Sequence, residues 1–386
     1  MVINMCEYNN VPKIRFKGFT DVWEQRKLED ITQIVMGQSP DSINYTENSD
    51  DTVLIQGNAD LNNGIVVPRI WSSQITKKSY PNDIIFTVRA PVGEIARNPY
   101  FATIGRGVAS FKGNDFLYQS LIQKKGNNYW NNISAGSTFD SINSDQLKNV
   151  IIDLPKNNLE QEKIGELFTN LDNLITLHQR KCDTLVNAKK SLLEKMFPKN
   201  SSNIPEIRFK EFTDVWEQRK LEEISNRFDN LRVPVSANER EKGTTPYYGA
   251  NGIQDYVKGF THNGEYVLIA EDGANDLKNY PVKYVNGLFW ANNHVHVVQG
   301  KEGICDNKYL KYCFTKTNIE SLLVGGGRAK LNANIMMSIN LTVPSFNEQV
   351  ELGRMFYELD NLITLHQRKL EKLKNIKKSM LDKMFV

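Results

Sequence analysis

The feature that most constrains this chain is a stretch that occurs twice without a single difference, at residues 171–181 and 359–369. Each copy lies within a longer proline-free segment, residues 159–197 and 347–385, whose apolar residues recur at the spacing of an amphipathic helix. A helix of that length extends about 55–60 Å at 1.5 Å per residue. One such helix cannot bury its apolar stripe alone in water, so we expect the two to pack against each other. The alternative is two ordinary helices that pack on separate domains.

A second repeated stretch precedes each helix. Residues 12–29 and 205–222, here called the lead segments, differ at only two positions. Together the repeats indicate an internal duplication with a period of about 190 residues, far longer than the roughly 20–50 residues of solenoid repeats. The polar residues 199–203 read as the linker between the two halves. We expect antiparallel helices, approximate two-fold symmetry, and a lead segment of one half that meets the helix of the other, so that the chain termini lie near each other.

The globular regions between the repeats, residues 31–157 and 224–345, are unlike each other. Both contain short strand-like runs broken by Gly, Asn, Asp and Pro. We expect strands near residues 83–89, 266–270 and 294–298, and a turn at residues 104–109 that leads into another strand. Each region ends with a small-residue turn, a short helix and a strand closed by Pro155 or Pro344. The predicted class is α+β: two α/β domains, residues 1–157 and 199–345, and two long helices forming a coiled coil, residues 158–198 and 346–386.

Composition limits the class of protein further. The chain has 386 residues, 24% charged residues and a formal net charge of +3, so a nucleic-acid partner is allowed but not demanded. Four cysteines are scattered without a Cys-x-x-Cys pair, which argues against a disulfide framework or a zinc site. No signal peptide and no apolar run near the ~18 residues of a membrane span is visible. We expect a soluble protein of the cytoplasm.

Catalytic motifs are weak. Residues 98–101, Asn-Pro-Tyr-Phe, lack the second proline of the usual adenine-N6 methyltransferase motif and read as a turn. No phosphate-binding Gly-x-x-x-x-Gly-Lys-Ser/Thr sequence is present. His294 and His296 would lie on one face of a strand, but no third metal ligand is near in sequence. The sequence therefore predicts no catalytic residue and no metal site.

On these features the chain resembles the specificity subunit of bacterial type I restriction–modification systems over essentially its whole length. The repeated lead segments and helices carry the resemblance. Shorter strings that also fit are residues 37–40 and 247–253 near the starts of the globular regions, and the junctions at residues 153–161 and 342–349.

The resemblance implies a binding function without catalysis in this chain. Two target-recognition domains would bind a bipartite, asymmetric sequence in double-stranded DNA. Two modification subunits would transfer a methyl group from S-adenosylmethionine to adenine N6, and restriction subunits would use ATP, with Mg²⁺, to move along DNA and cut it. The helices would set the domain spacing and dock these partners. The residues expected there are Leu171, Leu174, His178, Leu185, Leu359, Leu362, His366 and Leu373.

DNA contacts are expected from Lys and Arg on phosphates and from Arg, Asn, Gln and Ser at base edges. In the first domain the candidates lie in loops beside predicted strands: Gln38, Ser39, Arg89 and Arg106. In the second they are Tyr247, Tyr248, Asn251, Arg328 and Lys330. The competing hypothesis is a coiled-coil adaptor whose domains bind other proteins. The target bases, the spacing of the half-sites and any DNA-mimicking inhibitor are not readable from the sequence.

Overall fold

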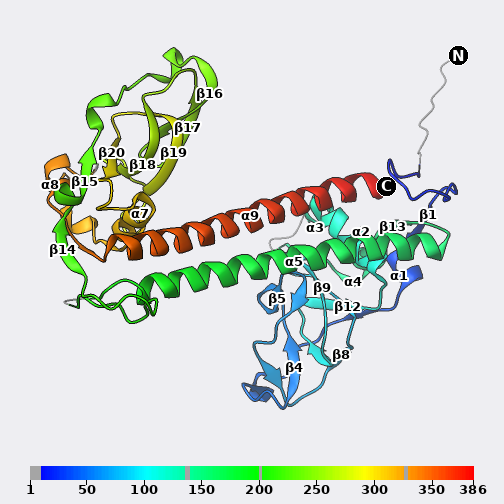
Figure 1. Ribbon diagram of the computed structural model, residues 1–386. Helices are drawn as coiled ribbons and strands as arrows, with labels where there is room; N and C mark the ends of the chain where they lie inside the picture. The colour runs from blue at the N-terminus through cyan, green and yellow to red at the C-terminus, as the bar shows by residue number, and fades with distance from the viewer. Residues whose placement is uncertain (1–9, 135–139, 200–201, 326–328) are drawn as a thin grey trace, which may run out of the picture. The chain divides into compact units, whose positions relative to one another are not determined.

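A computed structural model describes residues 10–134, 140–199, 202–325 and 329–386. The chain divides into two compact units (Figure 1). The first unit combines Met1–His178 with Lys369–Val386, and the second is Gln179–Arg368. Each unit therefore contains one globular region together with parts of both long helices. The domain boundaries predicted from the sequence follow the repeats instead of these packing units, and they stay a prediction.

The two long helices are α5 (Asn158–Lys195) and α9 (Phe346–Met384), within two residues of the predicted ends. In the first unit the Asp172 carboxylate lies 2.6 Å from the Lys377 ammonium, and the rings of Phe168 and Phe385 are 5.7 Å apart. Residue numbers thus fall along α5 as they rise along α9, which is an antiparallel arrangement. The second unit repeats it, with Lys189 2.6 Å from Asp360.

The lead segments attach each globular region to both helices. β1 (Glu24–Lys27) pairs with β13 (Ile151–Leu154), the strand just before α5. β14 (Glu217–Lys220) pairs in the same way with β21 (Asn340–Val343), just before α9. The backbone N–H of Ile14 donates to the carbonyl of Lys383 at 2.9 Å, and that of Ile207 donates to Lys195 at 2.9 Å. Each lead segment therefore meets the end of the other half's helix, and the first described residues lie beside the last turn of the chain, as predicted.

An aromatic cluster closes each of these junctions. In the first unit it contains the indole of Trp23, which is 2% exposed, and three phenylalanine rings: Phe116, Phe168 and Phe385. The equivalent rings of the second unit are Trp216, Tyr309, Phe356 and Phe197. In both clusters the aromatic residue just after the end of one long helix, Phe385 or Phe197, packs among rings contributed by the other half of the repeat.

The globular region of the first unit contains two sheets. The six-stranded sheet has the order β2 (Ile34–Met36), β12 (Val108–Phe111), β9 (Ile84–Thr87), β10 (Ile95–Arg97), β6 (Ile65–Val66) and β5 (Leu61–Asn62). The five-stranded sheet has the order β3 (Tyr45–Thr46), β7 (Trp71–Ser72), β4 (Thr52–Ile55), β11 (Ala102–Ile104) and β8 (Lys77–Ser79). The short helices are α1 (Leu28–Ile31), α2 (Asp115–Gly126), α3 (Tyr129–Ser134) and α4 (Ser144–Lys148). The predicted strand at residues 83–89 corresponds to β9, and the predicted turn at residues 104–109 leads into β12.

The globular region of the second unit has one main sheet. Its order is β15 (Ser225–Arg227), β20 (Val295–Gly300), β18 (His262–Ala270), β19 (Val282–Ala291), β16 (Lys242–Gly249) and β17 (Gly252–Val257). Its helices are α6 (Leu221–Ile224), α7 (Asn307–Lys316) and α8 (Ala333–Met337). The same helical frame thus carries two different sheet topologies, which confirms the α+β class and the duplication.

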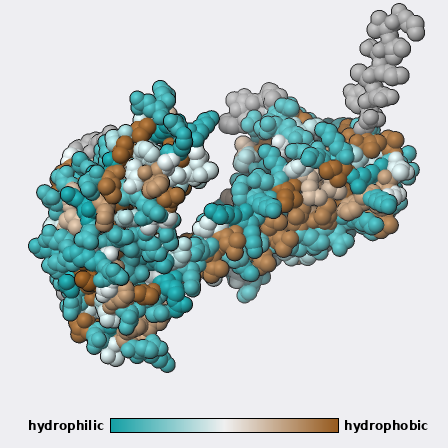
Figure 2. Space-filling model, turned by 45° about the horizontal axis from the view of Figure 1, so that its top comes forward, coloured by the Kyte–Doolittle hydropathy of each residue, from teal (hydrophilic) through white to brown (hydrophobic). Residues whose placement is uncertain are grey.

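The sequence predicted no membrane-spanning helix and no disulfide framework, and the following observations bear on the helices and the cysteines. None of the helices in the described ranges combines the length and apolar character that crossing a membrane requires. Figure 2 shows hydrophobic side chains lying among hydrophilic ones on one face of the molecule. Cys182, Cys305 and Cys313 are buried free thiols, and Cys6 lies outside the described residues.

Candidate nucleic-acid interface

Three loops of the first unit meet at one end of the six-stranded sheet. The N–H of Gly37 donates to the carbonyl of Val108 at 3.0 Å, and that of Gln38 donates to Ile104 at 2.9 Å. The N–H of Val88 donates to the carbonyl of Gly107 at 2.9 Å. The loops after β2, before β12 and after β9 are therefore held side by side. All four residues predicted in this domain lie in or next to these loops.

Their side chains differ in how much they are exposed. Gln38, Arg89 and Arg106 are exposed, and Ser39 is half-buried. The Ser39 hydroxyl accepts a hydrogen bond from the N–H of Arg106 at 3.2 Å, so Ser39 joins the loops. This end of the sheet can present one amide and two guanidinium groups to a ligand.

Sequence reasoning missed Gln56 at the same place. β4 and β11 pair in parallel with Ile55 opposite Ile104, and the N–H of Gly105 donates to the carbonyl of Ile55 at 2.8 Å. Parallel strands end at the same edge of a sheet, so Gln56 emerges beside Gly105. The available signal was weak: a polar residue and a glycine directly after a buried strand.

In the second unit Tyr247 is not available to DNA. Its side chain is 1% exposed, and its hydroxyl accepts from the N–H of Val235 at 3.0 Å and donates to the carbonyl of the same residue at 3.3 Å. The Arg240 guanidinium lies 4.2 Å from its ring centroid. Tyr247 lines a pocket of about 370 Å³ with Trp290. Its assignment as a DNA contact is corrected to a structural role, because a hydrophobic strand position buried the ring.

The neighbouring candidates are also engaged within the unit. Tyr248 is half-buried against Phe289, with ring centroids 6.0 Å apart, and burial raises the pKa of its hydroxyl. Asn251, in the turn between β16 and β17, donates from its amide to the carbonyl of Gly273 and accepts from the N–H of Asn275, both at 2.9 Å. Asn251 therefore fixes a neighbouring loop, although its side chain is exposed.

Lys330 is the predicted contact of the second unit that lies on an exposed loop with a charged side chain. Its ammonium lies 2.8 Å from the Glu271 carboxylate, and the hydrogen bond to Glu271 raises the pKa of Lys330. The segment around it is held by mutual backbone hydrogen bonds between Lys330 and Val324. Arg328 lies outside the described residues.

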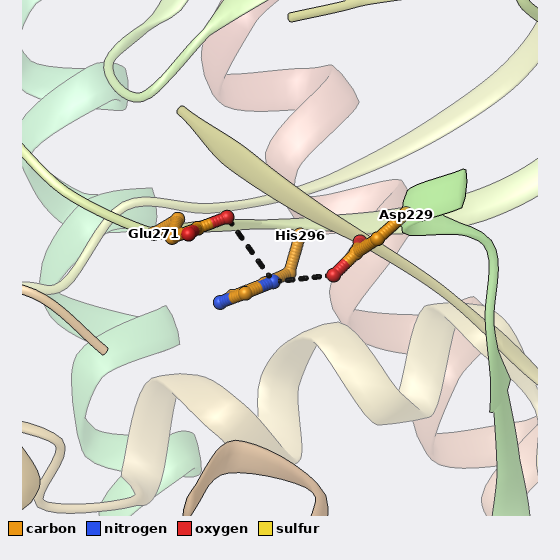
Figure 3. Close-up of side chains that lie close together, drawn as sticks. All are labelled: Asp229, Glu271 and His296. Atoms are coloured by element: carbon orange, nitrogen blue, oxygen red, sulfur yellow. Dashed lines mark hydrogen bonds and ion pairs between the residues drawn. The ribbon is translucent and has the colours of Figure 1, made fainter. Parts of the chain in front are cut away.

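Next to Lys330 is a group of titratable side chains, the buried His296 with the half-buried Asp229 and Glu271, shown in Figure 3. The His296 Nδ1 lies 2.7 Å from a carboxylate oxygen of Asp229 and 3.6 Å from one of Glu271. The Arg232 guanidinium is 2.5 Å from Glu271 and 3.6 Å from Asp229. Two carboxylates are thus paired with an arginine and a histidine.

These bonds oppose a metal-binding role for the group. The His296 Nε2 lies 2.8 Å from the carbonyl of Leu331, which can only accept, so this nitrogen carries a proton. Nδ1 lies 2.7 Å from the Asp229 carboxylate, so both ring nitrogens of His296 already have hydrogen-bond partners within the fold. Burial pushes the pKa of Asp229 up, but the hydrogen bonds from His296 and Val297 leave it below its usual value. The group is an ion-pair cluster that ties Leu331 and its loop to the sheet.

His294 does not join that cluster. It lies one residue before β20, and its Nδ1 is 2.5 Å from a carboxylate oxygen of Asp272. The possibility that His294 and His296 share a metal from one strand face is therefore not supported by their partners.

The Asn-Pro-Tyr-Phe stretch is a turn, as predicted. The Asn98 side chain is buried, and its amide donates to the Ser79 hydroxyl at 2.9 Å and to the carbonyl of Tyr100 at 2.8 Å. Its side-chain oxygen accepts from the N–H of Tyr100 at 3.0 Å. The polar groups that would have to bind an adenine are used to fold the turn.

On the long helices the predicted docking residues fall into two classes. Leu174 and Leu362 are 43% and 44% exposed, and so are the nearby Leu177 and Leu365, at 47% and 46%. The remaining candidates are half-buried: Leu171, His178, Leu185, Leu359, His366 and Leu373. Each copy of the repeated stretch therefore carries an exposed leucine pair one turn apart.

Comparison with known proteins places this geometry in a family. The profile described as "Type I restriction modification DNA specificity domain" matches residues 20–187 and 213–375. A putative type I restriction enzyme specificity subunit of Haemophilus influenzae, S.HindORF215P, is 46% identical over 149 residues, which are 39% of this chain and 38% of that protein. The MjaX specificity subunit of Methanocaldococcus jannaschii, also putative, is 29% identical over 48% of this chain and 45% of its own length. The matches to these two relatives thus span less than half of each.

Longer matches are more distant. The MjaIX specificity subunit of the same organism is 25% identical over 78% of this chain and 77% of its own length. Among solved structures, the type I restriction–modification S subunit from M. genitalium superposes with a TM-score of 0.70 at 18% identity, over 97% of this chain and 99% of that one. That superposition shows a shared fold.

Proposed function

Because the chain belongs to the type I restriction–modification DNA specificity family, whose domain matches it twice, we propose that it chooses the DNA sequence on which a type I complex acts. Each globular region binds one half of a bipartite target in double-stranded DNA. The observation that carries the proposal is the combination of one repeated frame with two different sheet topologies. Identical domains would call for identical half-sites, whereas different domains call for an asymmetric target.

The surface of the first unit supports DNA as the ligand. Exposed Arg89 and Arg106 lie at the same sheet end as exposed Gln38. Guanidinium groups bind phosphates and guanine edges, and carboxamides pair with adenine edges. On the second unit the exposed Lys330 would have to share its ammonium between Glu271 and a phosphate.

The long helices are proposed to dock two modification subunits. The exposed pairs Leu174–Leu177 and Leu362–Leu365 occur in identical sequence surroundings, one in each unit. Two equivalent apolar patches suit two copies of one partner. Those partners would use S-adenosylmethionine, and restriction subunits would use ATP and Mg²⁺, while this chain contributes sequence choice. The site of action is the cytoplasm, where bacterial DNA lies.

The test is to sequence single DNA molecules from the host with and without this gene and to score N6-methyladenine. The proposal expects a bipartite motif that disappears on deletion. Exchange of residues 31–157 for the same region of a relative should then alter one half of the motif only. If methylation is unchanged while the modification subunit is present, the DNA-recognition function is wrong and the adaptor hypothesis takes its place.

In vitro, retention of specific DNA should weaken steeply with salt, because phosphate binding releases counterions. Retention that is insensitive to salt and sequence would contradict DNA as the ligand.

A further inference from the structure

We propose that the first unit reads bases with a platform of three loops, residues 37–39, 56–57 and 105–107, and that Gln56 is a base-reading residue together with Gln38 and Arg106. The inference rests on the proposed function and specifies its chemistry. It assigns a carboxamide to an adenine edge and a guanidinium to a guanine edge in the major groove. Gln56 is not among the candidates selected from the sequence.

The platform is held together by direct backbone contact. A Cβ on Gly37 would lie 2.0 Å from the carbonyl oxygen of Gly105, and a Cβ on Gly107 would lie 2.1 Å from that of Gln56. Any side chain at Gly37 or Gly107 would push the loops apart, so both close approaches depend on glycine. Because the backbones touch, the side chains that leave them have fixed relative positions.

The pairing of β4 with β11 also holds the loops at residues 56–57 and 105–107 in place. Ile55 lies opposite Ile104 in the β4–β11 ladder, and the N–H groups of Gln56 and Gly57 both donate to the Asp60 carboxylate, at 2.8 and 3.1 Å. Asp60 is 4% exposed, so this anchor is protected from water. Preorganisation of this kind keeps the entropy cost of ordering a reading loop low on binding.

The three reading side chains are uncommitted. Gln38 and Arg106 are exposed, and Gln56 is half-buried. The Gln56 Cγ lies close to Gly105, since a Cβ added to that glycine would be 3.5 Å from it. Within the described residues, the carboxamides of Gln38 and Gln56 and the guanidinium of Arg106 form no hydrogen bond or ion pair; the backbone groups of Gln38 and Arg106 do, with Thr76 and Ser39. In the second unit, by contrast, the Tyr247 hydroxyl, the Asn251 amide and the Lys330 ammonium all have internal partners.

The chemistry of the uncommitted groups selects the ligand. Glutamine pairs in two places with the N6 and N7 of adenine, and arginine pairs with the O6 and N7 of guanine. Exposed Lys77, opposite Ile104 on β8, and exposed Arg89 flank the platform and suit phosphates. The platform therefore fits the major-groove edge of a half-site that contains adenine and guanine.

The experiment uses the full chain produced with its modification subunit in a host without other adenine methylation. The methylated motif is read by single-molecule sequencing for wild type, Arg106→Ala and Gln56→Ala. Arg26→Ala and Gln33→Ala, at exposed positions away from the platform in the same unit, are the matched controls. We expect Arg106→Ala to weaken the preference for guanine at one position of the half-site, and Gln56→Ala to weaken the preference for adenine at another. Each preference over the other bases should fall by roughly 5- to 150-fold.

Gln56→Glu is the sharper variant, because a carboxylate accepts from the N4 of cytosine. It should replace preference for adenine by preference for cytosine at one position. If Gln56→Ala fails to fold, the methylated motif of Gln56→Glu still tests whether Gln56 reads a base.

The outcomes separate the two levels of inference. A wild-type chain that yields no motif contradicts the proposed function itself. A wild-type motif that every platform variant reproduces unchanged contradicts the platform alone. Uniform loss of methylation at unchanged unfolding temperature would assign the residues to affinity and would also overturn base reading.

Discussion

The two units of this protein share their frame and differ in what the frame carries. In both, a lead segment forms a two-stranded ribbon with the strand before a long helix and then contacts the end of the other helix. In its globular region the first unit has two sheets, and the second unit has one main sheet. The difference teaches that the repeated sequence specifies contacts that hold the halves together, whereas the globular regions are free to diverge.

The frame contacts correspond pair by pair. Arg15 forms a two-bond ion pair with the buried Glu160, at 2.6 and 2.8 Å, and Arg208 does the same with Glu348, at 2.8 and 2.7 Å. Gly165 and Gly353 give both long helices the same close approach to a short helix, since a Cβ would lie 2.9 Å from Phe116 N in one case and 2.6 Å from Tyr309 N in the other. Such contacts tolerate few residue types, which explains why both halves carry the same arginine, glutamate and glycine at these positions.

The largest effect is expected from the aromatic clusters. Phe385→Ala should destabilise the first unit and Phe197→Ala the second, each by about 3–5 kcal/mol, because a buried aromatic side chain is lost. Peptide-resolved hydrogen exchange can assign the loss to β9 or to β18. Phe346→Ala, at a position 37% exposed, is the control with a small effect. Equal loosening of both units by either variant would show that the clusters do not serve separate units.

The buried ion pairs should come next. Arg15→Met and Arg208→Met each leave a glutamate that is at most 1% exposed without its partner, which should cost about 3 kcal/mol. Replacing the glutamate as well, in Arg15→Met with Glu160→Leu, should restore much of the loss. Urea unfolding measures both, with the exposed Arg26→Met as control. A double variant no better than the single one would contradict the assignment.

The stability of the second unit should fall at acid pH, because the Asp229–Glu271–His296 cluster belongs to that unit. The pKa values of Asp229 and Glu271 are lowered in the folded protein, against the effect of burial. Their stabilisation is therefore present above the unfolded pKa values, near 4, and is lost as the pH falls through the lower folded values. Asp229→Asn should consequently cost less unfolding free energy at pH 3.5 than at pH 6. An equal cost at both would show that the charge of Asp229 contributes nothing.

The smallest effect on stability is expected at the exposed leucines. Leu174→Ala and Leu362→Ala should change the unfolding free energy by less than about 0.5 kcal/mol, as at other surface positions. If these leucines dock the modification subunits, each single variant should still bind one copy, and the double variant should bind none. Native mass spectrometry counts the copies. Full assembly by the double variant would remove the leucines from the docking surface.

Much of the frame was predictable because its signals are local. The proline-free apolar periodicity placed both long helices to within two residues, and the repeated lead segments placed their antiparallel contacts. The turn at Asn98 was also predictable, since Asn followed by Pro favours a turn. For the candidate site, the sequence found Gln38, Ser39, Arg89 and Arg106 because they sit beside recognisable strands.

The rest depended on which distant residues meet. Tyr247 and Tyr248 look alike in sequence, yet burial and the Val235 backbone occupy Tyr247 almost completely. The sequence also could not show that the two ring nitrogens of His296 lie beside the Asp229 carboxylate and the carbonyl of Leu331.

By itself, then, the sequence determined the duplication, the length of the long helices and the non-identity of the two globular regions, because periodicity and repetition are properties of the chain order. It suggested antiparallel helices, and the Asp172–Lys377 and Phe168–Phe385 contacts established that direction. The tertiary structure decided which polar side chains remain available. Gln56 lies beside Gly105 only because β4 and β11 pair in parallel across almost 50 residues of chain. Strand pairing at that distance leaves no local signature, since it depends on the whole hydrophobic core that brings the strands together.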